Sequence, residues 1–155
     1  MRIQELAPDV VMFVGNEVES VATAFVDGAR VLLVDALGSE ADAARLKEVL
    51  CGEMGKTVHL IAATHFMSDH IAGMSLFPEA LTLAHRHHRQ AFLSQNRPVP
   101  ALYREPDIVL DNMALRWGRH QLRFLHNPGK TMDHFSVDGP TTGLVCVGDN
   151  IVGTI

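Results

Sequence analysis

The sequence has few cysteines, no long apolar run and no surplus of basic residues. Its two cysteines, Cys51 and Cys146, are too few for a disulfide framework and are expected to be inert thiols. No apolar stretch reaches the roughly 18 residues that a membrane span requires. The segment before Pro8 also lacks the apolar centre of a signal peptide. These absences predict a cytoplasmic protein that does not associate with membranes.

Positive charge is scarce as well. The chain has 13 Lys and Arg against 18 Asp and Glu, a formal net charge of −5, which argues against a general nucleic-acid binder because phosphates require excess cations. Apolar residues fill 47% of the 155 positions, which argues against disorder and predicts one domain over residues 1–155. Histidine is the abundant exception, with nine residues, most of them clustered.

Strands and helices alternate along the chain. The turn Asp27-Gly28 predicts a hairpin between strands at residues 21–25 and 31–34, and the second strand is apolar on both faces, as buried strands are. Ser39 is a candidate N-cap for a helix with an apolar stripe. Further strands are expected at residues 10–14, 58–63, 80–84 and 143–147, with a hairpin around Gly118, a short helix near residues 88–94 and a loop at residues 96–106.

Polar groups stand where the buried strands end. Asp35, residues 65–70 and Asp149 each follow such a strand, and Lys130 and His134 follow another. In layered α/β folds, functional sites lie beyond the carboxyl ends of strands, so these loops are expected to converge on one pocket. The alternative is coincidence, since strand ends are often polar without any function.

The segment His65-Phe66-Met67-Ser68-Asp69-His70 concentrates possible metal ligands on one loop. Imidazole and carboxylate groups suit zinc, iron or manganese. Three such groups within six residues could share one or two ions. The alternative reading is structural: Asp69 would cap a helix that starts near Ile71, and the histidines would hydrogen-bond locally.

The order of these segments resembles the metallo-β-lactamase fold superfamily of metal-dependent hydrolases. The family pattern T-H-x-H-x-D-H, then P-G-H-T, then G-D is matched in order by residues 64–70, 128–131 and 148–149. The Gly28 hairpin, the strand before Asp35 and the capped helix match too, so the resemblance spans essentially the whole chain. It implies an α/β fold, a four-layer αββα sandwich with the metal site on one edge, and we expect the C-terminal part of that sandwich to be missing from this chain.

The resemblance assigns a role to each matching residue. His65 corresponds to a ligand of the first metal ion, and Asp69 and His70 correspond to ligands of the second. Asp149 corresponds to the carboxylate that bridges both ions. Asp35 corresponds to a buried aspartate that supports the ligand loops without usually binding metal.

Two departures from the family pattern affect the first metal ion. Met67 replaces the second histidine of the first motif, and Lys130 replaces the histidine of P-G-H-T. A thioether is a poor zinc ligand, and a protonated lysine has no lone pair to donate. An ammonium about 4 Å from a divalent ion would repel it by roughly 8 kcal/mol at an effective dielectric of 20. We therefore expect the Lys130 ammonium to replace the first ion and pair with Asp149, the alternative being a lysine that turns to solvent.

The implied activity is metal-dependent hydrolysis with at most one ion per chain, either zinc or iron or manganese, the alternative being a site without metal. Metal-activated water would attack an ester, lactam, thioester or phosphodiester in a small-molecule substrate. Asp69 and Lys130 are the expected catalytic residues, one orienting water and the other stabilising an oxyanion. The alternatives are a catalytically silent binding or regulatory relative, and a copper protein that recruits Met67.

Family members continue beyond the position that corresponds to Ile155 and take a further histidine ligand from that region. We therefore expect the chain to form a homo-oligomer or to be completed by another chain segment. His134 is expected to make a local hydrogen bond near the pocket, and His59, His120 and His126, on predicted strands or at their ends, are expected to be structural. Residues 85–89, which include His85, His87 and His88, are expected to form a solvated, partly basic surface, the alternative being a site for an anion or a metal ion.

Overall fold

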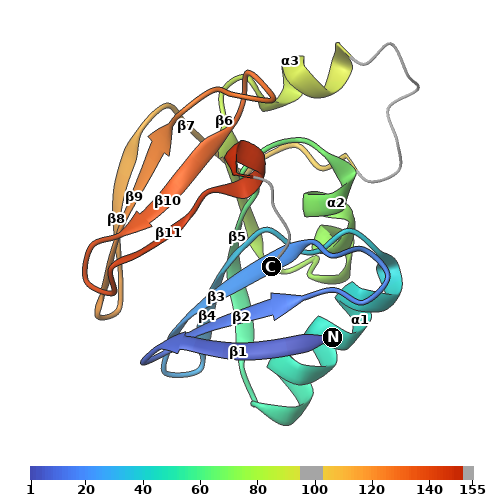
Figure 1. Cartoon of the computed structure of the whole chain (residues 1–155), viewed down its shortest axis with the longest axis vertical. Coiled ribbons are helices and arrows are strands. Elements are labelled where there is room, and N and C mark those ends of the chain that lie inside the picture. Colours follow the sequence, from blue (N-terminus) through green and yellow to red (C-terminus); the bar gives the residue numbers. More distant parts are fainter. Residues whose placement is uncertain (95–102, 152–155) are drawn as a thin grey trace.

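Residues 1–94 and 103–151 are described by the computed structural model, and they form two facing β-sheets with the helices to one side (Figure 1). The larger sheet runs in the order β1 (Arg2–Ala7), β2 (Val10–Val14), β3 (Val21–Asp27), β4 (Arg30–Val34), β5 (Thr57–Ala62), β6 (Leu81–His85) and β7 (Ile108–Leu110). The smaller sheet runs in the order β11 (Leu144–Cys146), β10 (Phe135–Gly139), β9 (His120–His126) and β8 (Met113–Trp117). The helices are α1 (Glu40–Lys47), a π-helical segment (Glu48–Glu53), α2 (Ser68–Ile71), α3 (His88–Leu93) and the 3-10 turns Ala72–Leu76 and Gly148–Asn150.

The larger sheet changes from antiparallel to parallel at β4. Strands β1 to β4 pair antiparallel, whereas β4 to β7 pair parallel. The β3–β4 turn is tight because Gly28 adopts a φ of 60°, which suits a two-residue hairpin turn. Parallel strands need crossovers, and α1 supplies the first of them between β4 and β5. The carboxyl ends of β4, β5 and β6 therefore lie along the same edge of the sheet.

Two apolar clusters fill the fold, one on each face of the larger sheet. Leu32 and Val34 of β4 join the cluster between the sheets, which includes Phe124 of the smaller sheet. Val31 and Leu33, the alternate residues of the same strand, join the cluster beneath the helices. This double burial is the reason that β4 is apolar on both faces, as its sequence predicted.

The predicted fold class is confirmed: the chain is α/β, with two sheets and few helices. The hairpin around Asp27-Gly28 is confirmed as β3–β4, and the Ser39 cap is confirmed because its Oγ accepts from the Asp42 amide at 3.1 Å. Three strands were not anticipated. β1 is largely polar, β7 is an apolar run of only three residues, and β10 is interrupted by Ser136 and Asp138, so none has a long apolar run.

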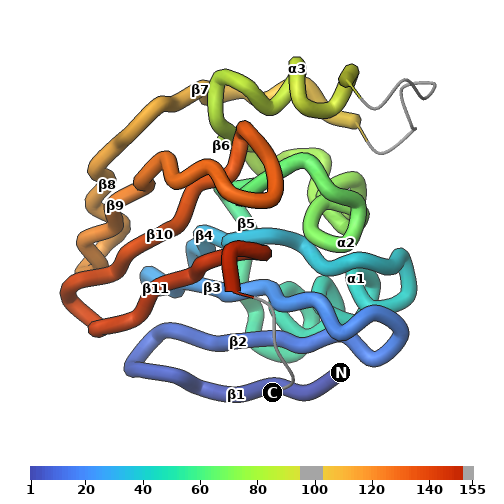
Figure 2. The backbone as a smooth tube through the Cα atoms, turned by 45° about the horizontal axis from the view of Figure 1, so that its top comes forward, coloured from blue at the N-terminus to red at the C-terminus, as the bar shows by residue number. Residues whose placement is uncertain are grey.

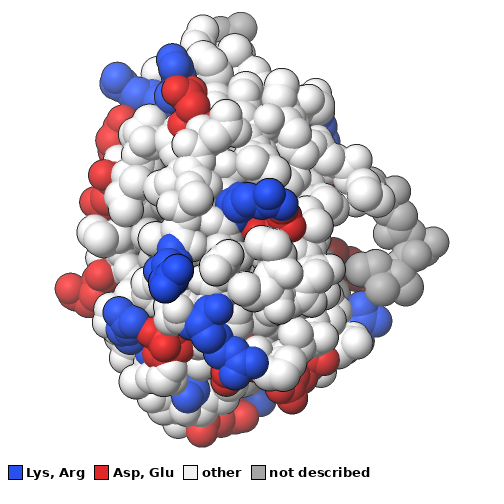
Figure 3. All heavy atoms as spheres, turned by 90° about the vertical axis from the view of Figure 1, so that its left-hand side faces the viewer, with Lys and Arg blue, Asp and Glu red and all other residues white. Residues whose placement is uncertain are grey.

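The outer face of the smaller sheet lies opposite the described helices, as the backbone trace shows (Figure 2). Side chains of both charge signs are interspersed over this side of the molecule (Figure 3), and Arg123 of β9 pairs there with Asp138 of β10. Within the described residues, no helix is both long and apolar enough to cross a membrane. The predicted loop at residues 96–106 falls partly outside the described residues.

Candidate functional site

Asp35 ties the end of β4 to the start of the loop that follows β5. Its buried carboxylate accepts hydrogen bonds from the Thr64 amide at 2.8 Å and from the Thr64 hydroxyl at 2.8 Å. Asp35 also adopts a φ of 59°, an uncommon conformation for a residue other than glycine. The carboxylate thereby fixes the backbone from which His65 projects.

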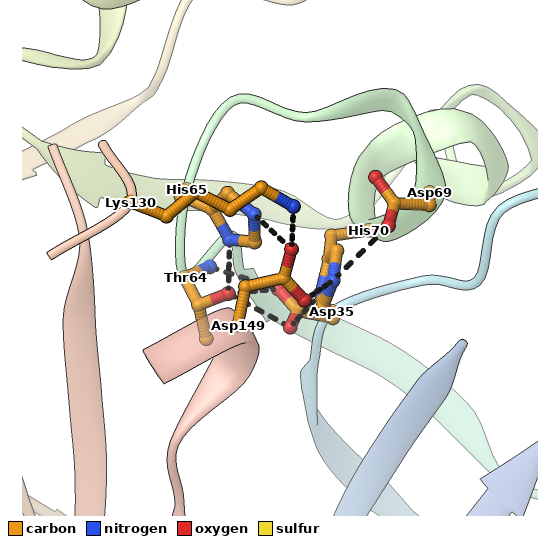
Figure 4. Close-up of polar contacts among 7 residues, drawn as sticks. All are labelled: Asp35, Thr64, His65, Asp69, His70, Lys130 and Asp149. Carbon is orange, nitrogen blue, oxygen red and sulfur yellow. Dashed lines mark hydrogen bonds and ion pairs between the residues drawn. The ribbon is translucent and has the colours of Figure 1, made fainter. Parts of the chain in front are cut away.

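His70 links two carboxylates across the site (Figure 4). Its Nδ1 lies 2.7 Å from Asp35 Oδ2 and its Nε2 lies 2.9 Å from Asp149 Oδ1. Burial disfavours the charged ring, but Asp35 above all, with Asp69 and Asp149, outweighs burial and raises the pKa of His70 to about 9. Without a metal ion, the ring is an imidazolium that donates to both carboxylates.

His65 is fully buried and keeps one ring nitrogen without a partner. Its Nδ1 lies 3.0 Å from the Thr64 hydroxyl, whose single proton is already directed to Asp35. Nδ1 must therefore carry a proton and donate it, which leaves the lone pair on Nε2. Burial lowers the pKa of His65, so the ring is neutral. That buried Nε2 has no hydrogen-bond partner and lies 3.6 Å from Asp149 Oδ2.

Lys130 reaches over the site and pairs with Asp149, as predicted. The Lys130 Nζ lies 2.5 Å from Asp149 Oδ2, and the lysine side chain is 46% exposed against 14% for the aspartate. The hydrogen bond to Asp149 raises the pKa of Lys130. Burial alone would raise the pKa of Asp149, but the Lys130 and His70 contacts hold it below its usual value. Both partners are therefore charged.

Asp149 reaches this position because Gly148 precedes it. Gly148 has a φ of 50°, and a Cβ built there would lie 2.5 Å from His134 Nε2 and 2.8 Å from the Thr64 hydroxyl. Any larger residue would push the segment away from the site. His134 is held by Asn127 at 3.1 Å, which agrees with the local hydrogen bond expected for it. The sequence showed the Gly-Asp pair but not this close approach.

His65, His70 and Asp149 form a compact group. Each of the three residues offers one possible metal-ligand atom, a ring nitrogen or a carboxylate oxygen, and these atoms all lie within 4.8 Å of one another. Asp69, in the first turn of α2, lies at the margin, with its Oδ2 3.6 Å from His70 Nε2 and its side chain 36% exposed. The three predicted segments therefore do meet in space.

The group opens into a cavity of about 480 Å³. Asp69, His70, Lys130 and Asp149 line its polar side. Its apolar side is formed by residues of β1, β2, β3 and β11 together with their flanks, namely Leu6, Met12, Val18, Val21, Leu144, Cys146 and Ile151. A small molecule would meet charged groups on one side and hydrocarbon on the other.

The described side chains offer enough suitable ligand atoms for one metal ion. Met67 and Lys130 occupy the two positions at which the family pattern supplies further imidazoles, and neither is a suitable zinc ligand. For a single ion, the neutral His65 with its free Nε2, His70 after release of the proton from its Nε2, and Asp149 would provide two nitrogen ligands and one oxygen ligand. Asp69 stands close enough to contribute a fourth.

The prediction of a solvated basic surface at residues 85–89 is wrong for two of its histidines. His85 and His88 are only 1% and 2% exposed. His88 Nδ1 contacts the fully buried Asp133 at 3.0 Å, and the His85 ring stacks on His126 with 3.8 Å between centroids. These partners come from β9 and the loop before β10, and a local pattern could not reveal them.

A family model described as the metallo-beta-lactamase superfamily matches residues 15–153. Among solved structures, a mutant of the HARLDQ-motif metallo-β-lactamase from Cronobacter sakazakii superimposes with a TM-score of 0.73 at 19% identity, covering 94% of this chain and 62% of that one. FEZ-1 from Legionella gormanii gives 0.72 at 18%, covering 88% and 57%. GOB-18 from Elizabethkingia meningoseptica gives 0.73 at 15%, covering 90% and 56%. The chain thus spans less than two thirds of each of these structures, and curated protein sequences provided no match.

Proposed function

The chain belongs to the metallo-β-lactamase superfamily, and from this premise we propose that it is a hydrolase that uses a single metal ion. His65, His70 and Asp149 would hold the ion, with Asp69 beside them. The ion would be zinc, iron or manganese, since these metals accept imidazole and carboxylate ligands. A substrate would be a small molecule with an ester, lactam, thioester or phosphodiester bond.

The free Nε2 of His65 carries this proposal. A buried polar atom without a partner costs about 1–3 kcal/mol. Among the eight such atoms of the described residues, Nε2 of His65 is the one that belongs to the group of possible metal ligands. Here the lone pair lies opposite a charged carboxylate, in a ring that burial keeps neutral. A metal ion would satisfy the nitrogen and the carboxylate together.

The bound ion would activate a water molecule and polarise the oxygen of the bond to be cleaved. Asp69 would orient that water and accept its proton, because its partly exposed carboxylate lines the cavity beside His70. Asp35 positions His70 through the 2.7 Å contact with Nδ1. Lys130 lines the same cavity and, once separated from Asp149, could stabilise an oxyanion.

The second candidate is a catalytically silent binding or regulatory protein in which Lys130 stands in for an ion. The 2.5 Å contact between Lys130 and Asp149 favours it. Lys130 and His70 supply two positive charges to Asp35 and Asp149, so these two carboxylates are paired without metal.

Elemental analysis of the purified chain separates these functions. About one equivalent of zinc, iron or manganese, with hydrolysis in a panel of the four substrate classes, supports the first proposal. His65→Gln should then lose the metal, whereas His59→Gln, which alters an exposed histidine on β5, should keep it. No metal after incubation with each ion would favour the silent protein, and copper alone would favour the softer site that includes Met67.

A further inference from the structure

We infer that Lys130 is an internal competitor of the metal ion: its ammonium and the ion bind the same oxygen of Asp149, so the site can load only when Lys130 withdraws. This inference concerns the regulation of the metal site and rests on the proposed function. It arises from the contacts of Asp149, which differ between its two carboxylate oxygens.

Each oxygen of Asp149 has a separate partner. Oδ1 accepts from His70 Nε2 at 2.9 Å, while Oδ2 is bound by Lys130 at 2.5 Å. Oδ2 is also the oxygen that faces the free Nε2 of His65, at 3.6 Å. Two ligands of a tetrahedral zinc ion lie about 3.4 Å apart when each bond is about 2.1 Å. Oδ2 and Nε2 are therefore spaced as ligands of one ion, and the ammonium holds the oxygen of that pair.

The ammonium and the ion exclude each other. Both are cations, and a divalent ion that contacts Oδ2 would lie close to Nζ in a partly buried site, where charges are weakly screened. A protonated lysine has no lone pair to offer the ion. One of the two cations must leave.

Lys130 is the partner that can leave. Its side chain is 46% exposed, and Asp149 is its one hydrogen-bond partner within the described residues. By contrast, His65 and His70 are buried, and Asp149 is only 14% exposed. The lysine stem is flexible enough to carry the ammonium into the cavity or to solvent, while the three ligands keep their places.

The strength of the contact between Lys130 and Asp149 sets the factor by which the lysine lowers metal affinity. A hydrogen bond between charged groups contributes the equivalent of about a tenfold to a hundredfold change in an equilibrium constant. The ion must displace that contact, so metal affinity is lowered by the same factor, and by linkage the ion weakens the lysine contact equally. Removing the ammonium should therefore tighten metal binding by about 10- to 100-fold.

The test is a zinc titration of the full chain against a competing chelator. Lys130→Met removes the charge and keeps an apolar stem, while Lys130→Arg keeps the charge. Lys56→Met is the matched control, because Lys56 is a partly exposed lysine that contacts the Gly28 carbonyl at 2.8 Å, away from the site. We expect Lys130→Met to bind zinc about 10- to 100-fold more tightly than the wild type, with the arginine variant and the control close to the wild type.

The outcomes separate this inference from the proposed function. Equal zinc affinity in all four proteins overturns the competition and leaves the metal site standing. An arginine variant as tight as the methionine variant also overturns it, because charge would then be irrelevant. No binding by any protein, Lys130→Met included, overturns both the inference and the proposed function. Lys130→Gln, a polar neutral variant, replaces the methionine variant if that protein does not fold.

Discussion

Replacing Asp35 by alanine should be the most damaging single change at the site of the metal-free protein. The carboxylate is 3% exposed and accepts from the Thr64 amide, the Thr64 hydroxyl and His70, at 2.8, 2.8 and 2.7 Å. Its loss leaves the buried His70 imidazolium without its main partner. Removing one member of a buried ion pair costs about 3–5 kcal/mol, more than a neutral hydrogen bond contributes.

The assay is urea denaturation of the metal-free chain, followed by circular dichroism. Asp107 provides a matched control, because it accepts from the Thr82 amide at 2.8 Å and the Thr82 hydroxyl at 2.9 Å in the same arrangement. Asp107 contacts no buried histidine and its side chain is 39% exposed, so Asp107→Ala should cost only about 1 kcal/mol. If Asp35→Ala costs no more than Asp107→Ala, the charged role of Asp35 in the network is refuted.

Three further predictions concern Gly148, the pair Met67 and Lys130, and the buried His85. Gly148→Ala should destabilise the chain by about 2–4 kcal/mol and abolish metal binding, because the new Cβ would displace the segment that carries Asp149; calorimetric melting and metal content check this, and unchanged binding would contradict it. Met67→His combined with Lys130→His should raise metal content from about one equivalent toward two, as measured by elemental analysis; an unchanged content would count against the placement of the site. Burial and two neighbouring histidines lower the pKa of His85 to about 4. As the pH falls, His85 is therefore protonated in the unfolded chain before it is protonated in the folded chain, which favours unfolding. His85 should then have no effect on the free energy of unfolding above about pH 6.5, and should lower it by up to about 3 kcal/mol as the pH drops toward 4. Urea denaturation at several pH values should show that His85→Gln removes this contribution to the pH dependence of stability.

The sequence predicted the parts of the site that depend on local patterns. Asp35, His65 and Asp149 each follow an apolar strand, and the parallel order of β4 and β5 brings the first two to one edge. The replacement of a histidine by Lys130 predicted the ion pair with Asp149, because an ammonium beside a carboxylate is the simplest substitute for a cation.

The remaining features depend on contacts between distant segments. His88 is buried by Asp133, which lies 45 positions away, so a run of histidines and arginines looked like a solvated surface. The strand β10 was missed because its sequence, Phe-Ser-Val-Asp-Gly, contains two polar residues whose pairing with β9 is not visible locally. The tautomer of His65 could not be predicted either, because it depends on the Thr64 hydroxyl. That hydroxyl donates its proton to Asp35 and can therefore only accept from Nδ1 of His65.

The two contacts of Asp149 differ in sequence separation, and this difference favours an order in which they form during folding. Asp149 meets Lys130 across 19 positions but meets His70 across 79. For a flexible chain, closing the longer loop costs about 1.3 kcal/mol more in entropy. A folding chain should therefore form the pair between Lys130 and Asp149 before the contact between His70 and Asp149.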